Sequence, residues 1–373
     1  MHILVPTGIF HPEPGGPASY LYHFLPELLA RGHTVEVITF SDEPPAEAYP
    51  YPVQRIPRTN ILHRNWRYYR AVRARLNAAD GVFVNSLGLS LPRLRQPSVM
   101  KIVGDRAWER CRNRGWIPQD EDIDTFQTRR YGPLVEWVKR ARTHEALAMD
   151  HIIVPSAYLK RMVGGWGVPA ERIRVIYNAF AVAEPAIPLS EDERRALGIP
   201  APAPLLVMAA RLAPWKGGEH LLKALNHLPG VHLIIAGDGP MRHAWQGLAA
   251  QLTISDRVHF LGQVPQAQLL RYVASADYLV LYSGYEGLSH VVLEALAQGT
   301  PVIASDKGGN PEVIRQGENG WLVPYPDAGA LVRTLKTALF ESEPLHPHLD
   351  TARFTWETMT TQTIALLEKH FAP

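Results

Sequence analysis

The stretch YEGLSHVVLEALAQGTPVIASDKGGNPEVIRQGENGW, residues 285–321, carries the strongest structural signals in the chain. Its apolar residues predict a helix that begins after an N-cap at Ser289 and ends at Gly299. A short apolar strand, PVIASD, follows this helix. Glu286 lies in the turn before the helix, and Glu294 lies inside it. The order of turn, helix and buried strand is typical of an α/β sheet.

The same turn has the features of a phosphate site. Gly287 lies close to the expected helix N-terminus, where free backbone N–H groups favour an anion. Glu286 in the turn and Glu294 in the helix could then hold hydroxyl groups on either side of that phosphate. This arrangement is the one expected of a sugar-nucleotide site.

Outward from this stretch, strand and helix signals alternate along the 373 residues, a length that suggests two domains. Helical patterns are expected around 17–31, 65–79, 131–149 and 157–166. Strands are expected at HILVPTG, HTVEVITF, GVFVNS, SVMKIVG and HIIVPS, and then, after a restart at residue 204, at PLLVMAA, HLIIAGDG, VHFLG, YLVLYS and PVIAS. The Pro-rich segment 181–203 between the two sets reads as a linker with a small helix, and 354–371 as a final amphipathic helix.

Composition narrows the classes of protein. With 46% hydrophobic and 20% charged residues, the chain is typical of globular proteins. A single cysteine allows no internal disulfide, and no apolar run is long enough to span a membrane, so we expect a cytoplasmic protein. The net charge of +2 hides an asymmetry: residues 1–180 hold 24 Lys+Arg and 17 Asp+Glu, and the remainder holds 14 and 19.

The E-x7-E spacing of Glu286 and Glu294, followed by EALAQGTPVIASDKGGNPE, resembles the retaining glycosyltransferases of the GT4 family, which have the GT-B fold. RLAPWKG, IIAGDGP, SADYLVLYS and VPSAYLKRMVGGWGV also match family segments in family order. The resemblance implies two Rossmann-like doubly wound domains that face each other across a cleft. We expect an acceptor-side domain at 1–180, a nucleotide-sugar-binding domain at 181–355, and a helix at 356–373 that crosses back to the first domain.

Arg211 and Lys216 are the candidate cations of the site. Transfer from a nucleotide sugar leaves a diphosphate, and its developing negative charge needs positively charged hydrogen-bond donors. The R-x4-K spacing matches the diphosphate clamp of the family. The alternative for an isolated pair of this kind is a solvated surface.

The resemblance assigns roles to further residues of the second domain. Glu294 corresponds to the carboxylate that binds the ribose hydroxyls, and Glu286 to the one that contacts the transferred sugar and steadies positive charge at its anomeric carbon. The alternative for either glutamate is a solvated helix face. The backbone of Gly287, Leu288 and Ser289 would contact sugar or phosphate.

Backbone contacts to the donor are expected at several further positions. Gly15 and Gly16 form the family loop that closes over the diphosphate, and Pro17 favours a helix start beside them. Gly237 lies in the turn of IIAGDGP, which is equally consistent with a structural role. Val264 marks the segment that holds the base in the family. We favour a UDP-sugar over a GDP-sugar, although backbone contacts carry no side-chain signature that separates the bases.

The chain departs from the family after its fifth strand signal. Many relatives carry a histidine there, whereas this chain reads KIVGDRAWER, with Asp105 as the nearest polar residue. Asp105 is therefore a candidate for contact with the sugar or the acceptor. Its alternative role is that of a turn or helix-cap aspartate.

The leading function is a retaining hexosyltransferase that uses a nucleoside-diphosphate sugar and a hydroxyl acceptor such as a lipid-linked glycan. A sugar epimerase or phosphorylase of the same architecture, and a catalytically silent sugar-nucleotide-binding protein, are the alternatives. The histidines are scattered along the chain and there is a single cysteine, so the sequence shows no His/Cys metal-ligand cluster, and we expect neither a metal nor a cofactor. No nucleic-acid motif is present either, and no nucleic-acid partner is expected.

The segment RTNILHRNWRYYRAVRARL, residues 58–76, contains six arginines and no acidic residue. From Asn65 onward it reads as a helix, and Arg-rich helices with interfacial aromatic residues can lie on anionic membranes. The alternative is a solvated helix with its aromatic side chains in the core. On the membrane reading, the protein would be peripheral on the inner face of the membrane.

Overall fold

The computed structural model describes residues 1–13, 15–42, 48–180, 185–347 and 351–372. The chain divides into two compact units, which are described separately. Unit 1 comprises residues 1–177 and 357–373, and unit 2 comprises residues 178–356. Each unit is built on one parallel sheet, and the α/β class with two doubly wound sheets is thereby confirmed.

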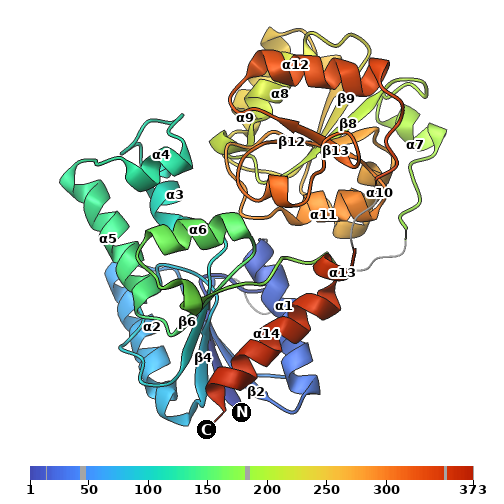
Figure 1. Cartoon of the computed structure of the whole chain (residues 1–373). Helices are drawn as coiled ribbons and strands as arrows, with labels where there is room; N and C mark the ends of the chain where they lie inside the picture. Colours follow the sequence, from blue (N-terminus) through green and yellow to red (C-terminus); the bar gives the residue numbers. More distant parts are fainter. Residues whose placement is uncertain (14, 43–47, 181–184, 348–350, 373) are drawn as a thin grey trace. The chain divides into compact units, whose positions relative to one another are not determined.

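The sheet of unit 1 has seven parallel strands in the order β3-β2-β1-β4-β5-β6-β7. These strands are β1 (His2–Pro6), β2 (Thr34–Phe40), β3 (Val53–Ile56), β4 (Gly81–Val84), β5 (Ser98–Lys101), β6 (His151–Val154) and β7 (Ile173–Val175). The helices are α1 (Gly16–Ala30), α2 (Ile61–Arg75), α3 (Arg106–Asn113), α4 (Ile123–Thr128), α5 (Pro133–Leu147), α6 (Ala157–Gly165) and α14 (Trp356–Phe371). Helices α1 and α14 cover one face of this sheet, and α2 and α5 cover the other (Figure 1).

The sheet of unit 2 has six parallel strands in the order β10-β9-β8-β11-β12-β13. These strands are β8 (Leu205–Ala209), β9 (His232–Ala236), β10 (Val258–Gly262), β11 (Tyr278–Leu281), β12 (Val302–Ser305) and β13 (Gly320–Val323). The helices are α7 (Glu191–Ala196), α8 (Gly218–Leu225), α9 (Arg242–Gln251), α10 (Gln266–Ala274), α11 (His290–Ala297), α12 (Ala328–Lys336) and α13 (Thr351–Phe354). Helices α8, α9 and α12 lie on one face of the sheet (Figure 1).

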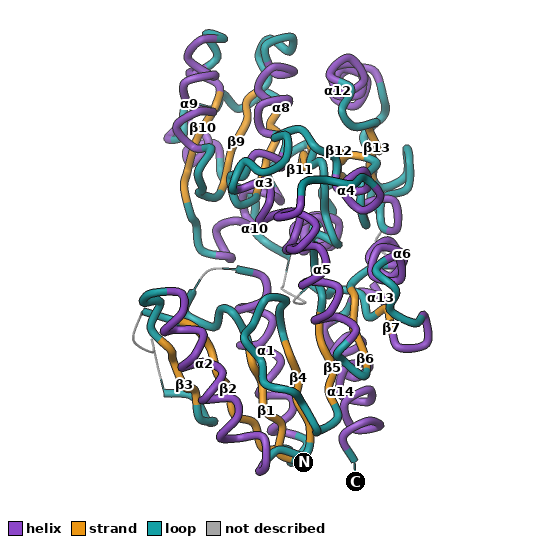
Figure 2. The backbone as a smooth tube through the Cα atoms, turned by 90° about the vertical axis from the view of Figure 1, so that its left-hand side faces the viewer, coloured by secondary structure: helices purple, strands orange, loops and turns teal. Residues whose placement is uncertain are grey.

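The central strands are fully buried because helices cover both faces of each sheet. Strand β8 reads LLVMA, and all five of its residues are buried. Buried parallel strands require continuous apolar runs, and these runs are what the sequence analysis detected. Figure 2 shows the strands of unit 1 side by side, with α2 crossing in front of them.

Three strands were missed by the sequence analysis, namely β3, β7 and β13. All three are edge strands of their sheets. Their residues are mostly half-buried or exposed, because an edge strand has a neighbour on one side only. Such strands lack the apolar run that identifies a central strand in a parallel sheet.

One helix start differs from the expected one. Helix α2 begins at Ile61 instead of Asn65, because the side chain of Asn60 caps it by accepting a hydrogen bond from Leu62 N at 2.9 Å. Ser289 does precede α11, but its side chain forms no capping hydrogen bond. The expected end at Gly299 is present, with a φ of 78° that suits glycine.

Candidate active site

The strand order of unit 2 defines where a ligand site is expected. The chain passes from β8 through β9 to β10 in one direction, and from β11 through β12 to β13 in the other. Strands β8 and β11 are neighbours at the centre of the sheet, so the connections diverge between them. In open α/β sheets this switch point opens a crevice at the carboxyl ends of the strands, where ligands bind.

An ion pair spans this switch point. Lys216 follows β8, Glu286 follows β11, and Lys216 Nζ lies 2.6 Å from Glu286 Oε1. The two side chains are 18% and 9% exposed, respectively. The surface alternative therefore does not describe Lys216, which is largely enclosed and pairs with Glu286. The sequence analysis named both residues but did not anticipate their contact.

The two loops that carry this ion pair are joined through their backbones. Gly217 has a φ of 75°, and a Cβ atom there would lie 1.7 Å from the carbonyl oxygen of Tyr282. Gly284 N donates to the carbonyl of Trp215 at 2.8 Å. Only glycine permits this approach at Gly217, so the position of Lys216 depends on the residue that follows it.

The loop after β12 supports Glu286 from another side. A Cβ atom at Gly308, where φ is 66°, would lie 1.9 Å from the carbonyl oxygen of Glu286. Gly309 N donates to the same oxygen at 3.0 Å, and its own α-carbon faces the carbonyl of Gly287. The two glycines in SDKGGNPE thus hold the backbone of the YEG turn.

Arg211 and Gly237 lie on neighbouring loops. Arg211 is exposed, and its guanidinium carbon lies 5.4 Å from the ring centroid of Trp215. Gly237 has a φ of 127°, and a Cβ atom there would lie 2.0 Å from the carbonyl oxygen of Ala210. Gly237 is therefore required by packing, which is the structural role that the sequence analysis had left open.

Glu294 lies in α11 and is half-buried. Burial raises the pKa of its carboxyl above the usual value, and a hydrogen bond with Gln266 opposes that rise. Gln266 is the first residue of α10 and comes two positions after Val264, which is half-buried. The expected base-binding loop and the expected ribose carboxylate therefore lie close together. The sequence analysis did not single out Gln266, although it lies within the quoted segment 262–270.

The backbone between the two glutamates is largely enclosed. Gly287 and Leu288 are buried, and the carbonyl of Leu288 accepts a hydrogen bond from Asn178 Nδ2 at 2.9 Å. Ser289 is half-buried at the N-cap position of α11. The first turn of α11 contains no acidic residue, which suits the binding of an anion there.

Three predicted site residues belong to unit 1. Gly15 and Gly16 follow β1 and lie at the start of α1, and Gly15 has a φ of 148° with its α-carbon close to Ile9. Asp105 caps α3 by accepting from Ala107 N and Trp108 N. Its side chain is completely buried and forms an ion pair with Arg142. This arrangement matches the helix-cap alternative for Asp105, whose two carboxylate oxygens are engaged by the helix start and by Arg142.

The part of the chain that the structure describes contains no group of three or more His, Cys, Asp or Glu that could hold a metal ion. The unit 2 site presents cations, carboxylates and the backbone N–H groups of a helix start. These groups suit the recognition of a phosphorylated, hydroxyl-rich ligand.

Comparison with known families agrees with this class of site. The sequence model of "Glycosyltransferase Family 4" matches residues 14–184, and that of "Glycosyl transferases group 1" matches residues 190–351. Together they span both units, and the chain belongs to the GT4-type glycosyltransferases.

Curated relatives include the lipopolysaccharide core biosynthesis glycosyltransferase LpsE of Rhizobium meliloti, 38% identical over 172 residues, or 46% of this chain and 48% of LpsE. A D-inositol 3-phosphate glycosyltransferase of Corynebacterium efficiens is 32% identical over 192 residues, which cover 48% of this chain and 45% of the relative. The chain thus matches about half the length of these relatives.

Solved structures share the whole fold. Sucrose-phosphate synthase from Thermosynechococcus elongatus superposes with a TM-score of 0.80 at 22% identity, covering 100% of this chain and 99% of that one. HepE from Anabaena, solved in complex with UDP and glucose, gives a TM-score of 0.76 at 21% identity, covering 99% and 100%. The two Rossmann-like units are those of the GT-B fold, as the sequence predicted.

Proposed function

We propose that this protein is a retaining glycosyltransferase that moves a hexose from a nucleoside-diphosphate sugar to a hydroxyl acceptor. The observation that carries the proposal is the Lys216–Glu286 ion pair at the switch point of unit 2. It places a mobile ammonium and a carboxylate side by side, where a sugar and its diphosphate would meet. UDP is the favoured nucleotide because HepE, which shares the fold, was solved with UDP and glucose.

In this proposal the donor exchanges partners with the ion pair. The ammonium group of Lys216 and the guanidinium of Arg211 donate hydrogen bonds to the diphosphate. The carboxylate of Glu286, no longer paired with Lys216, then accepts hydrogen bonds from the sugar. As the bond between the anomeric carbon and the phosphate oxygen breaks, both cations stabilise the charge that develops on the leaving diphosphate. The acceptor oxygen forms the new bond on the same face, and its proton passes to the departing phosphate oxygen.

Glu286 contacts sugar hydroxyls in this arrangement and stabilises positive charge at the anomeric carbon. Glu294 accepts from the ribose hydroxyls, and the backbone near Val264 holds the base. The first turn of α11, with Gly287, Leu288 and Ser289 before it, binds phosphate or sugar through backbone N–H groups.

The first test combines a donor screen with product analysis. A panel of UDP- and GDP-sugars is screened by thermal shift, and acceptors are then tested with the most stabilising donor. Proton NMR should show that the product keeps the anomeric configuration of the donor, and EDTA should leave the rate unchanged. An inverted product would refute the retaining mechanism. Turnover of the donor with the acceptor omitted would instead favour the epimerase or phosphorylase alternative.

We further propose that α2 brings the protein to an anionic membrane, and that the acceptor is lipid-linked. Tyr68 is fully buried and donates to the carbonyls of Thr7 and Ile38, as the core alternative expected for an aromatic residue of α2. The opposite face of α2 is different. Leu62 and Trp66 are 81% and 55% exposed there. Residues at i, i+4 and i+8 share a helix face, which adds the exposed Arg70 to these two apolar residues.

No helix in the described residues is long and apolar enough to cross a membrane. Any attachment through α2 would therefore be peripheral and would rest on both charge and apolar contact. Each arginine near an anionic surface contributes about 1 kcal/mol.

Vesicle sedimentation should detect this attachment. Binding to anionic vesicles at low salt is expected to fall by about tenfold or more when Arg67, Arg70 and Arg73 are changed to glutamate, because three charges are reversed. The matched control changes Arg161, Arg172 and Arg174 to glutamate; these three arginines are also exposed on unit 1. Equal losses in the two triple variants would mean that net charge, and not α2, governs binding. No binding by the unaltered protein would favour a soluble acceptor.

A further inference from the structure

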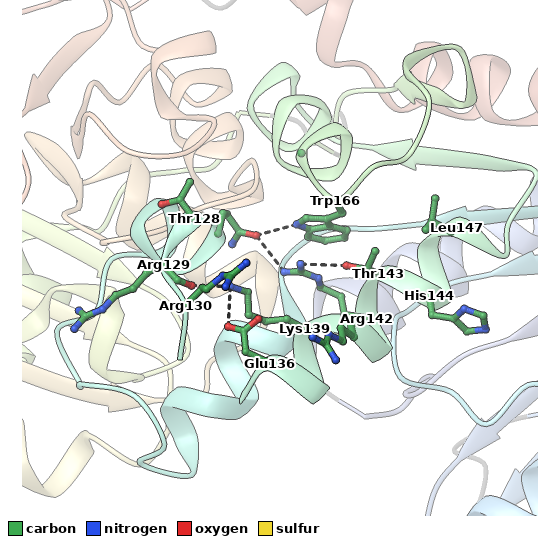
Figure 3. A pocket seen from close by; sticks show the side chains of 13 residues that line it. Thr128, Arg129, Arg130, Glu136, Lys139, Arg142, Thr143, His144, Leu147 and Trp166 are labelled. Atoms are coloured by element: carbon green, nitrogen blue, oxygen red, sulfur yellow. Dashed lines mark hydrogen bonds and ion pairs between the residues drawn. The ribbon is translucent and has the colours of Figure 1, made fainter. Parts of the chain in front are cut away.

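A second concave site is lined by residues of unit 1 alone. A pocket of about 600 Å³ is formed by the segment after α4, one side of α5 and the end of α6 (Figure 3). This volume is in the range of small-ligand sites. Its lining contains one carboxylate, Glu136, against five permanent cations: Arg129, Arg130, Lys139, Arg140 and Arg142.

One wall of the pocket is a fixed polar network. Arg142 is buried, and its Nη1 donates to Asp105 Oδ2 and, at 3.1 Å, to Gln127 Oε1. The same Gln127 oxygen accepts from Trp166 Nε1 at 2.9 Å. The guanidinium carbon of Arg142 lies 4.0 Å from the ring centroid of Trp166. Ring and amide thus hold the guanidinium in place before any ligand arrives.

One hydrogen-bond donor of this network lacks an acceptor. The Nε–H of Arg142 is buried and has no hydrogen-bond partner among the described residues. A buried donor left without an acceptor is unfavourable, because it has lost its hydrogen bond to water without a replacement. An anionic ligand in the pocket would be attracted by the charge of this buried guanidinium.

The cations of the pocket differ in how far they are already engaged. Lys139 Nζ donates to the carbonyl of Arg129 at 2.9 Å and lies 3.5 Å from Glu136. Arg130 and Arg140 are exposed and form no ion pair or side-chain hydrogen bond with the residues that the structure describes. Arginine forks suit phosphate because they can donate two parallel hydrogen bonds to it. Arg130 and Arg140 are therefore the groups available to a ligand.

The pocket is connected to the functional edge of its sheet. Asp105 comes four residues after the end of β5, at the carboxyl edge where parallel sheets bind ligands. Arg142, which lines the pocket, forms an ion pair with Asp105 and so links the pocket to this edge. Asp105 thereby acts as a positioning residue for a cationic wall.

We propose that this pocket binds a phosphate group carried by the acceptor. The inference rests on the proposed glycosyltransferase function, and it narrows the acceptor to a phosphorylated compound. The phosphate can belong to a soluble sugar phosphate or to a lipid headgroup, since both present the same oxygens to Arg130 and Arg140.

The test uses the full chain saturated with UDP, so that the diphosphate site of unit 2 is filled. Glucose 6-phosphate is titrated by calorimetry with glucose as the neutral control, and vesicles of phosphatidylcholine with or without phosphatidic acid form the lipid arm. The pocket variant is Arg130→Gln/Arg140→Gln. The matched control is Arg93→Gln/Arg95→Gln, two exposed arginines of unit 1 that do not line the pocket.

In at least one arm, the pocket variant is expected to weaken binding of the phosphate probe by tenfold or more, while the control variant binds like the unaltered protein. Loss in the glucose 6-phosphate arm identifies a soluble acceptor. Loss confined to vesicles with phosphatidic acid identifies a lipid headgroup, and α2 is intact in both proteins. Unchanged affinity in both arms, or equal weakening by the control, overturns the proposal.

The two proposals can fail independently. UDP affinity should be the same in the pocket variant and the unaltered protein, because Arg130 and Arg140 are not among the residues expected to contact the nucleotide. The Arg211→Ala variant should bind glucose 6-phosphate normally. If the unaltered protein transfers no sugar from any donor of the panel but still binds the phosphate probe through Arg130 and Arg140, the proposed function fails while the phosphate pocket stands.

Discussion

Replacement of Lys216 or Arg211 by alanine is expected to lower kcat/KM by about 10²-fold or more for each, because each cation is proposed to stabilise charge on the leaving diphosphate. Steady-state rates with the donor from the screen provide the measurement. The matched control is Lys223→Ala, which removes an exposed lysine of α8 that pairs with Glu219 in the same unit. Turnover near the level of the unaltered protein in either variant would remove that residue from the clamp.

The Lys216 variant needs a stability control that the Arg211 variant does not. Removal of Lys216 leaves the carboxylate of Glu286 enclosed without its ion-pair partner. Loss of one partner from a buried pair costs about 3–5 kcal/mol, and the partial exposure of Lys216 reduces that figure. The double variant Lys216→Ala/Glu286→Gln removes the unpaired charge and should recover much of the lost melting temperature. Arg211 is exposed, so Arg211→Ala should melt like the unaltered protein.

Substitution of Glu286 and of Glu294 is expected to affect different quantities, namely kcat for Glu286 and UDP affinity for Glu294. Glu286→Gln should lower kcat by about 10²-fold with little change in UDP affinity, because its proposed partner is the reacting sugar. Glu294→Gln should weaken UDP binding by about tenfold or more, since hydrogen bonds to charged groups are worth about 1.5–3 kcal/mol. Titration of UDP into both variants separates the roles. Equal loss of UDP affinity in the two would contradict this division.

The raised pKa of Glu294 adds a pH dependence with a defined sign. A carboxyl whose pKa lies above the usual 4.5 takes up its proton earlier as the pH falls. A protonated Glu294 loses acceptor capacity for the ribose hydroxyls. As the pH falls, UDP affinity of the unaltered protein should therefore decrease at a higher pH than it would with a glutamate of ordinary pKa. Glu294→Gln should lack this component, and identical pH profiles for the two proteins would refute it.

The central strands could be predicted from local sequence, because burial on both faces of a sheet imposes continuous apolar runs. Strand β8, LLVMA, is an example. The edge strands β3, β7 and β13 could not be predicted in the same way. Each of the three has only three or four residues, and both β3 and β7 contain an arginine, whereas the edge strand β10 carries the longer run VHFLG and was predicted.

The candidate site shows the same division. The residue types and their spacing in 285–321 were sufficient to select Glu286 and Glu294, and R-x4-K selected Arg211 and Lys216. The spacing contained no information on which side chains touch. Lys216 and Glu286 are 70 residues apart, and they meet because β8 and β11 are neighbours in the sheet.

Asp105 illustrates what a residue type alone leaves undecided. An aspartate after a strand can contact a ligand or cap a helix, and both roles use the same acceptor oxygens. The structure pairs Asp105 with Arg142, 37 residues later, and buries its side chain. The sequence by itself determined the family, the α/β class and the candidate residues of the proposed donor site. Only the tertiary structure decided the ion pair, the glycine contacts that position it, and the cationic pocket of unit 1, because each of these depends on side chains that meet across different strands and helices.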